Sequence, residues 1–275
     1  MVRRRMLLSV VVVGMFSAAA FAIAPMGPPM APLPQGQYAG VGGYAFSDQN
    51  LEISGPGSSI AGTGGEAYLS DIQSSMYYGG LVYGVADGWN VYGVLGIADA
   101  EWDGDGPSAD FDGGSGFAFA IGCKKTIFTD EESGTVWGTV FQFSQARRID
   151  DKFTPTGGSA DTWGNGHIGV GAASGQSAAE LDLYAIQLAA GPTVPLCEGV
   201  CVYGGPFLNF VEGDLEVKML STGGRSNYEL EQHLELGGYV GLQAELGDPN
   251  ILLGAEFLWT GEAWGVGIGA TILCP

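Results

Sequence analysis

The chain has 275 residues, of which ten are Lys or Arg and thirty are Asp or Glu, giving a formal net charge of −20. A surface this acidic repels nucleic acid, which excludes nucleic-acid binding. Disorder is disfavoured, because 46% of the residues are hydrophobic and 11% are aromatic. Glycine supplies 48 residues. It disfavours helices and suits turns, bends and barrel interiors.

The N-terminus has the pattern of a secretory leader. Arg3, Arg4 and Arg5 precede an apolar stretch over residues 7–16, and alanines at 20 and 22 match an A-x-A-like cleavage site. We expect a signal peptide over residues 1–22, and hence export. A retained membrane anchor is the alternative, but the apolar stretch is short for a spanning helix.

Residues 23–36 contain a proline-rich run, PMGPPMAPLPQG. Proline cannot donate to a sheet ladder, so we expect a periplasmic linker here and a barrel domain over residues 37–275. Beyond the leader, no apolar run approaches the roughly 18 residues of a spanning helix. A membrane-embedded form would therefore cross as strands.

Ten segments have strand character, and most exceed the mean globular strand of about five to six residues. They suit the 9–11 residues or so of a tilted membrane strand. In chain order they are residues 37–46, 73–86, 89–102, 116–128, 135–147, 179–195, 201–217, 227–246, 251–260 and 262–273. A count of eight or twelve would follow if a hairpin were split or merged.

Alternation is clearest over residues 227–246. Period two over this length is typical of a strand. We assign its apolar positions to the lipid face: Tyr228, Leu230, Leu234, Leu236, Val240, Leu242 and Leu246. We assign its polar positions to the lumen: Glu229, Glu231, His233, Glu235, Gln243 and Glu245.

The connections alternate in length. Long ones at residues 47–72, 103–115 and 148–178 alternate with short ones at 87–88, 129–134, 196–200 and 247–250. Outer-membrane barrels have long outer loops and short periplasmic turns. The sequence therefore predicts an all-β, antiparallel, up-and-down transmembrane β-barrel.

Tryptophan positions fit two interfacial girdles. Trp89 and Trp137 fall at the expected periplasmic rim, and Trp102, Trp259 and Trp264 at the outer rim. The alternative is that these tryptophans cap the core of a soluble, secreted β-barrel or sandwich.

The glycine- and aromatic-rich strands, above all WNVYGVLGIADAEW at residues 89–102, resemble small bacterial outer-membrane barrels of the OmpA-like and opacity-protein-like type. The resemblance covers residues 37–273. It implies residence in the outer membrane with lipid as a partner. Members usually end in an aromatic residue, whereas this chain ends GATILCP.

Four cysteines are present, and export brings them into an oxidising compartment. Cys197 and Cys201 flank a short turn, and a directly opposed pair lies within disulfide range. We predict a Cys197–Cys201 bridge, and we expect Cys123 and Cys274 to stay unpaired because they belong to distant strands.

The loop DAEWDGDGPSAD approximates the spacing of a calcium loop. Flanking strands instead of helices, and Asp in twelfth place, favour a solvated acidic loop over a metal site. The candidate oxygen ligands are Asp99, Glu101, Asp103, Asp105 and Asp110.

We expect the lumen to hold paired charges, because unpaired buried acids are costly. The predicted lumen charges are Glu229, Glu231, His233, Glu235, Glu245, Glu256, Lys124, Arg147 and Arg148. Ion pairs that fill the barrel are one interpretation, and a cation-selective lining is the other.

We expect no enzyme and no cofactor. Ten-stranded omptin-type proteases resemble this barrel in strand count, but the only histidines are His167, six residues after Asp161, and His233. We expect a structural or surface-contact role through long extracellular loops that meet surface ligands or other cells. A narrow cation-selective, porin-like channel is the alternative.

Overall fold

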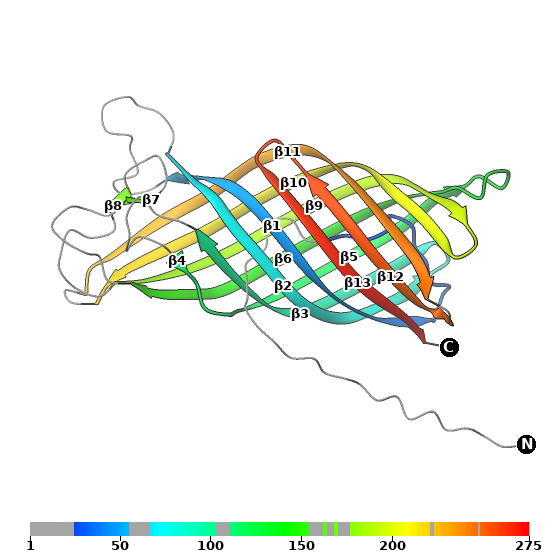
Figure 1. Ribbon diagram of the computed structural model, residues 1–275, viewed down its shortest axis with the longest axis horizontal. Helices are drawn as coiled ribbons and strands as arrows, with labels where there is room; N and C mark the ends of the chain where they lie inside the picture. Colours follow the sequence, from blue (N-terminus) through cyan, green and yellow to red (C-terminus); the bar gives the residue numbers. More distant parts are fainter. Residues whose placement is uncertain are drawn as a thin grey trace, which may run out of the picture.

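The structure is a computed structural model that describes residues 25–54, 67–102, 111–153, 162–163, 168–169, 177–220, 223–246 and 248–274. These residues form a tilted β-barrel without helices (Figure 1). No helix in these ranges is long and apolar enough to cross a membrane.

Ten long strands make the barrel wall, and three two-residue strands lie at one end. The wall strands are β1 (Tyr38–Ser54), β2 (Ala67–Ala86), β3 (Trp89–Trp102), β5 (Gly116–Thr129), β6 (Val136–Phe153), β9 (Ser177–Cys197), β10 (Val200–Met219), β11 (Arg225–Leu246), β12 (Asp248–Trp259) and β13 (Ala263–Cys274). The short strands are β4 (Phe111–Asp112), β7 (Thr162–Trp163) and β8 (Ile168–Gly169).

Each wall strand pairs antiparallel with its neighbours in the chain, and β13 pairs with β1 to close the ring. The fold class and the ten strands predicted from the sequence are confirmed. Several strands are longer at the outer end than predicted: β1 continues to Ser54, β6 to Phe153, and β2 begins at Ala67.

The β12–β13 hairpin is shorter than the rest of the wall. It turns over at Thr260–Glu262, and beyond it β1 pairs directly with β11 at Glu52↔Glu231 and Ile53↔Leu230. This junction leaves eight strands in the outer part of the wall. Eight strands enclose an interior just wide enough for side chains to fill.

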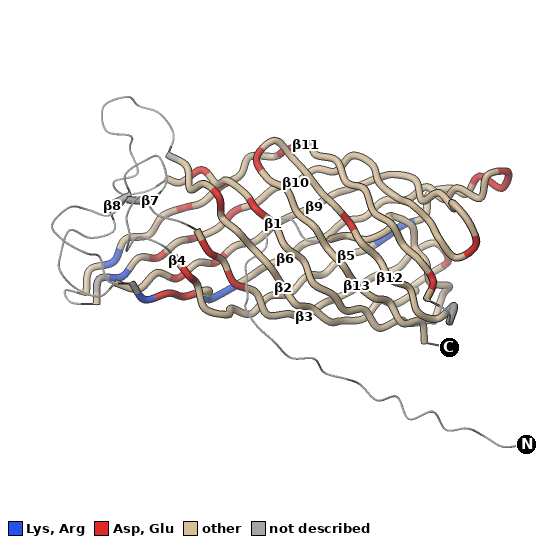
Figure 2. The backbone as a smooth tube through the Cα atoms, in the orientation of Figure 1, with Lys and Arg blue, Asp and Glu red and all other residues tan. Residues whose placement is uncertain are grey.

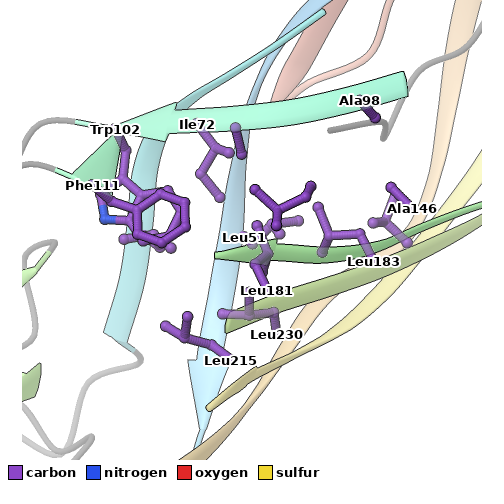
Figure 3. Close-up of a cluster of buried hydrophobic side chains, with 14 of the residues drawn as sticks. Leu51, Ile72, Ala98, Trp102, Phe111, Ala146, Leu181, Leu183, Leu215 and Leu230 are labelled. Atoms are coloured by element: carbon purple, nitrogen blue, oxygen red, sulfur yellow. The ribbon is translucent and has the colours of Figure 1, made fainter. Parts of the chain in front are cut away.

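The outer interior is a continuous apolar core (Figure 3). Trp102 stacks on Phe111 at 3.9 Å between ring centroids, and both side chains are buried. Leucines from four strands converge with them: Leu51, Leu181, Leu183, Leu215 and Leu230. We refer to this cluster as the outer core. It closes the lumen at that end.

The barrel exterior carries a belt of exposed apolar side chains, which fits lipid contact. The belt includes Tyr77, Leu81, Val91, Leu95, Ile121, Phe141, Leu188, Leu236, Val240, Leu253, Phe257, Val266 and Ile268. Trp89 and Trp137 are exposed near one edge of the belt, and Trp259 and Trp264 near the other. Trp102 was wrongly assigned to this girdle, because its side chain points inward to the outer core.

Three β-bulges lie where the apolar belt ends. An extra residue occurs in β2 near Asp71, in β6 near Arg148, and in β11 between Gln232 and Glu235. Asp71 and Arg148 have positive φ angles of 56° and 59°. A bulge shifts the side-chain alternation by one position. In each of these strands, the alternate apolar residues that point outward within the belt therefore point into the barrel beyond the bulge.

Candidate functional site

The proline-rich segment, residues 25–36, lies inside the periplasmic half of the lumen. Met26 and Leu33 are each only 3% exposed, and the chain contacts inward-facing groups on β3, β5 and β12. The expectation of a periplasmic linker was wrong. We call residues 25–36 the plug, because they fill space that an open barrel would leave empty.

Hydrogen bonds from the wall replace the sheet partners that the plug lacks. The side chain of Asn90 brackets Leu33: Oδ1 accepts from the Leu33 amide at 3.0 Å, and Nδ2 donates to its carbonyl at 2.9 Å. The Ala31 amide donates to Thr126 Oγ1 at 3.1 Å. Asn90 is fully buried, so its loss would leave unpaired polar groups in the lumen.

Glycines of the wall make room for the plug. A Cβ added at Gly84 would collide with the Pro34 carbonyl, one at Gly138 with the Pro29 carbonyl, and one at Gly267 with the Pro25 ring. Part of the glycine content therefore has a steric cause that the sequence pattern did not reveal.

Two charged residues hold the plug in the middle of the barrel. Glu256 Oε1 accepts a hydrogen bond from the Met26 amide at 2.8 Å, and Lys124 Nζ donates to the Pro28 carbonyl at 2.9 Å. The ammonium of Lys124 also lies 5.7 Å from the Tyr92 ring centroid. The structure thus places two of the predicted lumen charges inside the lumen, where each bonds to the plug.

A cavity of about 150 Å³ lies between part of the plug and the wall. Its lining is mostly apolar, and its polar groups include Lys124, Glu256 and Gln142. Gln142 bridges Tyr92 and Gln187, accepting from the Tyr92 hydroxyl at 2.7 Å and donating to Gln187 Oε1 at 2.8 Å. Polar groups therefore lie between the plug and the outer core.

Five of the predicted lumen charges lie on the exterior instead. Arg147 and Arg148 are both exposed at the β6 bulge, where the Arg148 amide donates to Asp182 Oδ1 at 2.7 Å. Glu229, Glu231 and His233 are exposed on β11, because the bulge beyond Gln232 reverses the alternation. Assignment of these five to the lumen was wrong.

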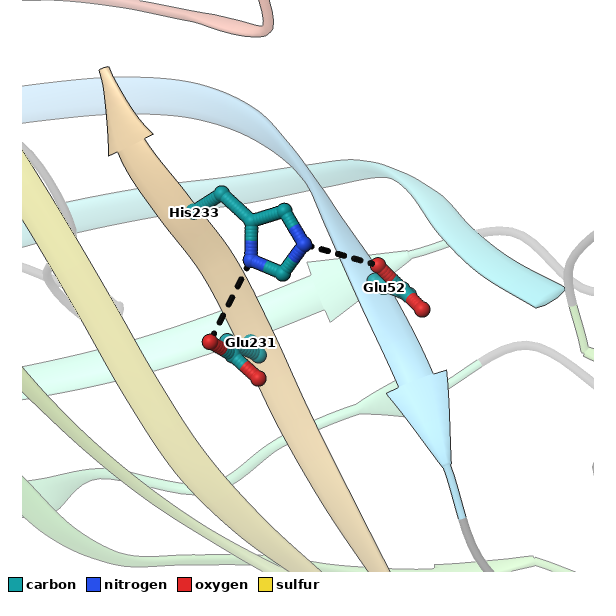
Figure 4. A network of polar contacts seen from close by, with 3 residues as sticks. All are labelled: Glu52, Glu231 and His233. Atoms are coloured by element: carbon teal, nitrogen blue, oxygen red, sulfur yellow. Dashed lines mark hydrogen bonds and ion pairs between the residues drawn. The ribbon is translucent and has the colours of Figure 1, made fainter. Parts of the chain in front are cut away.

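His233 lies at the junction of β1 and β11 (Figure 4). Its Nδ1 is 3.2 Å from Glu231 Oε1 and its Nε2 is 3.8 Å from Glu52 Oε2. The imidazole is 74% exposed. His167, the other histidine considered for catalysis, lies outside the described residues.

The last two predicted lumen charges lie at turns, Glu235 beside the β12–β13 turn and Glu245 at the periplasmic turn before β10. Glu235 Oε2 accepts from Gln232 Nε2 and from the Glu262 amide, each at 3.3 Å, so it contacts the β12–β13 turn. Burial and the charges of Glu235 and Glu52 raise the pKa of Glu262. Glu245 is exposed at the periplasmic turn, where its amide donates to the Gly199 carbonyl.

Charged positions, most of them acidic, gather at the end of the barrel that carries β4, β7 and β8 (Figure 2). We call these outward-facing charged residues the acidic collar. Its acids are Glu52, Asp71, Glu101, Asp112, Asp150, Glu180, Asp182, Glu212, Asp214, Glu216, Glu229 and Glu231, and its bases are Arg147, Arg148, Lys152, Lys218 and Arg225. Only one pair of these, Arg225 with Glu216 at 3.0 Å, forms a salt bridge among the described residues.

Two calcium-loop candidates, Asp99 and Glu101, lie at the outer end of β3. Asp103, Asp105 and Asp110 lie outside the described residues. No group of three metal-ligating side chains occurs in the part of the chain that the structure describes.

All four cysteines are free. Cys197 is opposite Val200, whereas Cys201 is opposite Pro195. The turn is therefore tighter than expected, with Gly199 at a φ of 72°, and the two cysteines do not face each other. The predicted Cys197–Cys201 bridge was wrong.

No family model and no curated protein matches the sequence. Solved structures do match: the outer membrane protease OmpT from Escherichia coli has a TM-score of 0.51 and 9% identity over 89% of this chain and 98% of its own. The chain has the fold of a bacterial outer-membrane β-barrel.

Two further solved structures match with TM-scores below 0.5. The translocator domain of autotransporter NalP from Neisseria meningitidis has a TM-score of 0.44 and 13% identity over 86% of this chain and 89% of its own. The attachment invasion locus protein Ail of Yersinia pestis, in complex with the heparin analogue sucrose octasulfate, has a TM-score of 0.37 and 16% identity over 87% of this chain and 99% of its own.

Proposed function

We propose that this protein resides in a bacterial outer membrane as a sealed barrel that presents an acidic surface to the outside. The observation that carries the proposal is the filling of the lumen at both ends, by the outer core and by the plug. A barrel with two seals in series is suited to anchoring a surface and not to passage of solutes.

The apolar belt supports membrane residence over a soluble, secreted barrel. Leu81 and Leu95 are each 62% exposed, and Leu236 is 72% exposed. A contiguous apolar surface of this kind marks lipid or partner contact. We expect extraction from membranes only with detergent, and faster gel migration before boiling than after it. Recovery in the soluble periplasmic fraction would contradict membrane residence.

The acidic collar supports a surface-contact role. Its acids outnumber its bases, and it lies beyond the belt on the side of the long connections. Complementary charge steers encounter and suppresses unsuitable partners. The collar therefore favours partners with basic surfaces and disfavours sulfated or phosphorylated polyanions.

Adhesion of cells that produce the protein to polylysine-coated and heparin-coated surfaces tests this role. The collar variant carries Glu212→Gln, Asp214→Asn and Glu229→Gln, and the matched control removes three acids from the periplasmic turn with Asp130→Asn, Glu131→Gln and Glu132→Gln. We expect only the collar variant to reduce adhesion to polylysine. Equal adhesion of both variants and the parent would contradict the role.

A further inference from the structure

The cavity beside the plug has the size of a site for one small molecule. Its volume of about 150 Å³ is similar to that of apolar protein cavities that bind a single molecule of benzene. Its lining residues lie on the plug and on the strands of the barrel wall. A molecule with one ring therefore fits the cavity, whereas a lipid acyl chain or an oligosaccharide is too large.

A glycine on β12 leaves space on one side of the cavity. Gly254 lies two positions before the inward-facing Glu256, so both residues belong to the inner face of β12. A Cβ added at Gly254 would meet only the Leu242 carbonyl, at 3.8 Å, which is an ordinary contact distance. A larger side chain at Gly254 would therefore extend into the cavity without displacing the wall.

Aromatic rings and thioethers contribute to the lining. The rings belong to Tyr78, Tyr92 and Tyr203, and the thioethers belong to Met26 and Met76. Aromatic rings attract one another in stacked and edge-to-face arrangements, and they also attract methionine sulfur. This lining therefore favours an aromatic ligand over an aliphatic one of the same size.

One buried hydroxyl group in the lining has no partner. Ser144 is 3% exposed, and its Oγ has no hydrogen-bond partner among the described residues. In the register Ser144 lies between Ala120 of β5 and Ala185 of β9, whose side chains offer no polar group. A buried hydroxyl without a partner costs free energy, and a ligand hydroxyl that bonds to Ser144 recovers that cost.

The charged groups in the lining are already bonded to the plug. Lys124 Nζ donates to the Pro28 carbonyl at 2.9 Å, and Glu256 Oε1 accepts from the Met26 amide at 2.8 Å. Because these two charges are opposite in sign, they add no net charge to the cavity. An ionised ligand would bring an uncompensated charge into the lumen, so the cavity favours a neutral molecule.

We propose that this cavity binds one small, neutral aromatic molecule that carries a hydroxyl group. Its ring packs among the tyrosines and methionines of the lining, and its hydroxyl bonds to Ser144 Oγ. The outer core closes the lumen on the outer side, and the plug fills the periplasmic side. The ligand therefore enters and leaves when the plug moves.

Phenol is the probe, and methionine-methyl NMR of the full chain refolded in detergent is the measurement. A bound ring shifts the methyl signals of Met26 and Met76, which line the cavity, and Met219 at the end of β10 is the internal control. We expect a saturable shift at Met26 and Met76 and none at Met219. A shift that grows linearly at all three, as phenol in the detergent would cause, would overturn the proposal. So would the absence of any shift, which a cavity that holds only water would give.

Filling the cavity tests where phenol binds. Gly254→Leu should abolish the saturable shift, whereas Gly40→Leu, at a position where a Cβ meets nothing within 4 Å, should retain it. A saturable shift that persists in Gly254→Leu would overturn the assignment to this cavity. The serine variants below decide the matter if Gly254→Leu does not fold.

Removal of the serine hydroxyl tests the hydrogen bond. Ser144→Ala should weaken phenol binding roughly fivefold or more, and it should leave the binding of toluene, which has no hydroxyl, unchanged. Ser74→Ala removes another buried, unpartnered hydroxyl that does not line the cavity, and it should change neither affinity. Equal phenol affinity in Ser144→Ala and the parent would overturn the proposed bond. Phenol binding does not depend on ion conduction, so a sealed lumen is tested separately.

Discussion

The amide of Met26 and the carboxylate of Glu256 lie 2.8 Å apart and join positions 230 residues distant in the chain. This bond fixes the plug to the second-last strand of the wall. It also means that the Glu256 carboxylate in the lumen is bonded to the backbone of the plug and does not line an open path for ions. The plug and the barrel wall therefore form one folded unit.

Displacing the plug should loosen residues 25–36 without opening the wall. Gly267→Leu places a side chain where Pro25 lies. We expect faster hydrogen exchange of the Met26 and Leu33 amides in this variant. Gly40→Leu is the matched control, since a Cβ at Gly40 meets nothing within 4 Å. Unchanged exchange in Gly267→Leu would mean that the plug does not depend on this contact.

The outer core should contribute strongly to stability. Trp102→Ala removes a buried aromatic that stacks on Phe111, and such truncations cost about 3–5 kcal/mol. Trp264→Ala, on the exposed exterior, should cost less. The free energy of unfolding in urea measures both. A Trp102 variant as stable as the Trp264 variant would contradict the packing of the outer core.

Depth in the membrane should decide the effect of a charge on the exterior. Leu95→Arg lies in the apolar belt, where arginine costs about 2–4 kcal/mol near the bilayer midplane. Leu220→Arg lies at the outer turn after β10, and its cost should approach zero. Refolding titrations in phospholipid vesicles measure both. Equal costs would contradict the placement of the belt.

The strands were predictable because alternation of period two persists through most of the wall. The segment at residues 89–102 was predicted with both ends correct. The spacing of its two tryptophans was also informative. Trp89 and Trp102 are an odd number of positions apart, so in a strand without a bulge their side chains must lie on opposite faces. Trp102 could have been assigned to the interior on that ground.

The lumen was not predictable in the same way. The bulge after Gln232 inserts one residue, so Glu231 faces outward although its spacing from Gln243 places both on one face. The plug was missed because a proline-rich segment cannot pair in a β-sheet, and we therefore assigned it to a linker. It can nevertheless lie in a lumen where side chains such as Asn90 supply its hydrogen bonds.

Planar-bilayer recording of the refolded full-length protein tests the sealed barrel most directly. The outer core and the plug close the lumen in series, so we predict no steady conductance steps, and none after deletion of residues 25–36 alone, because the outer core persists. Steady cation-selective steps from the intact protein, abolished by Glu256→Gln, would contradict a sealed lumen and identify a channel.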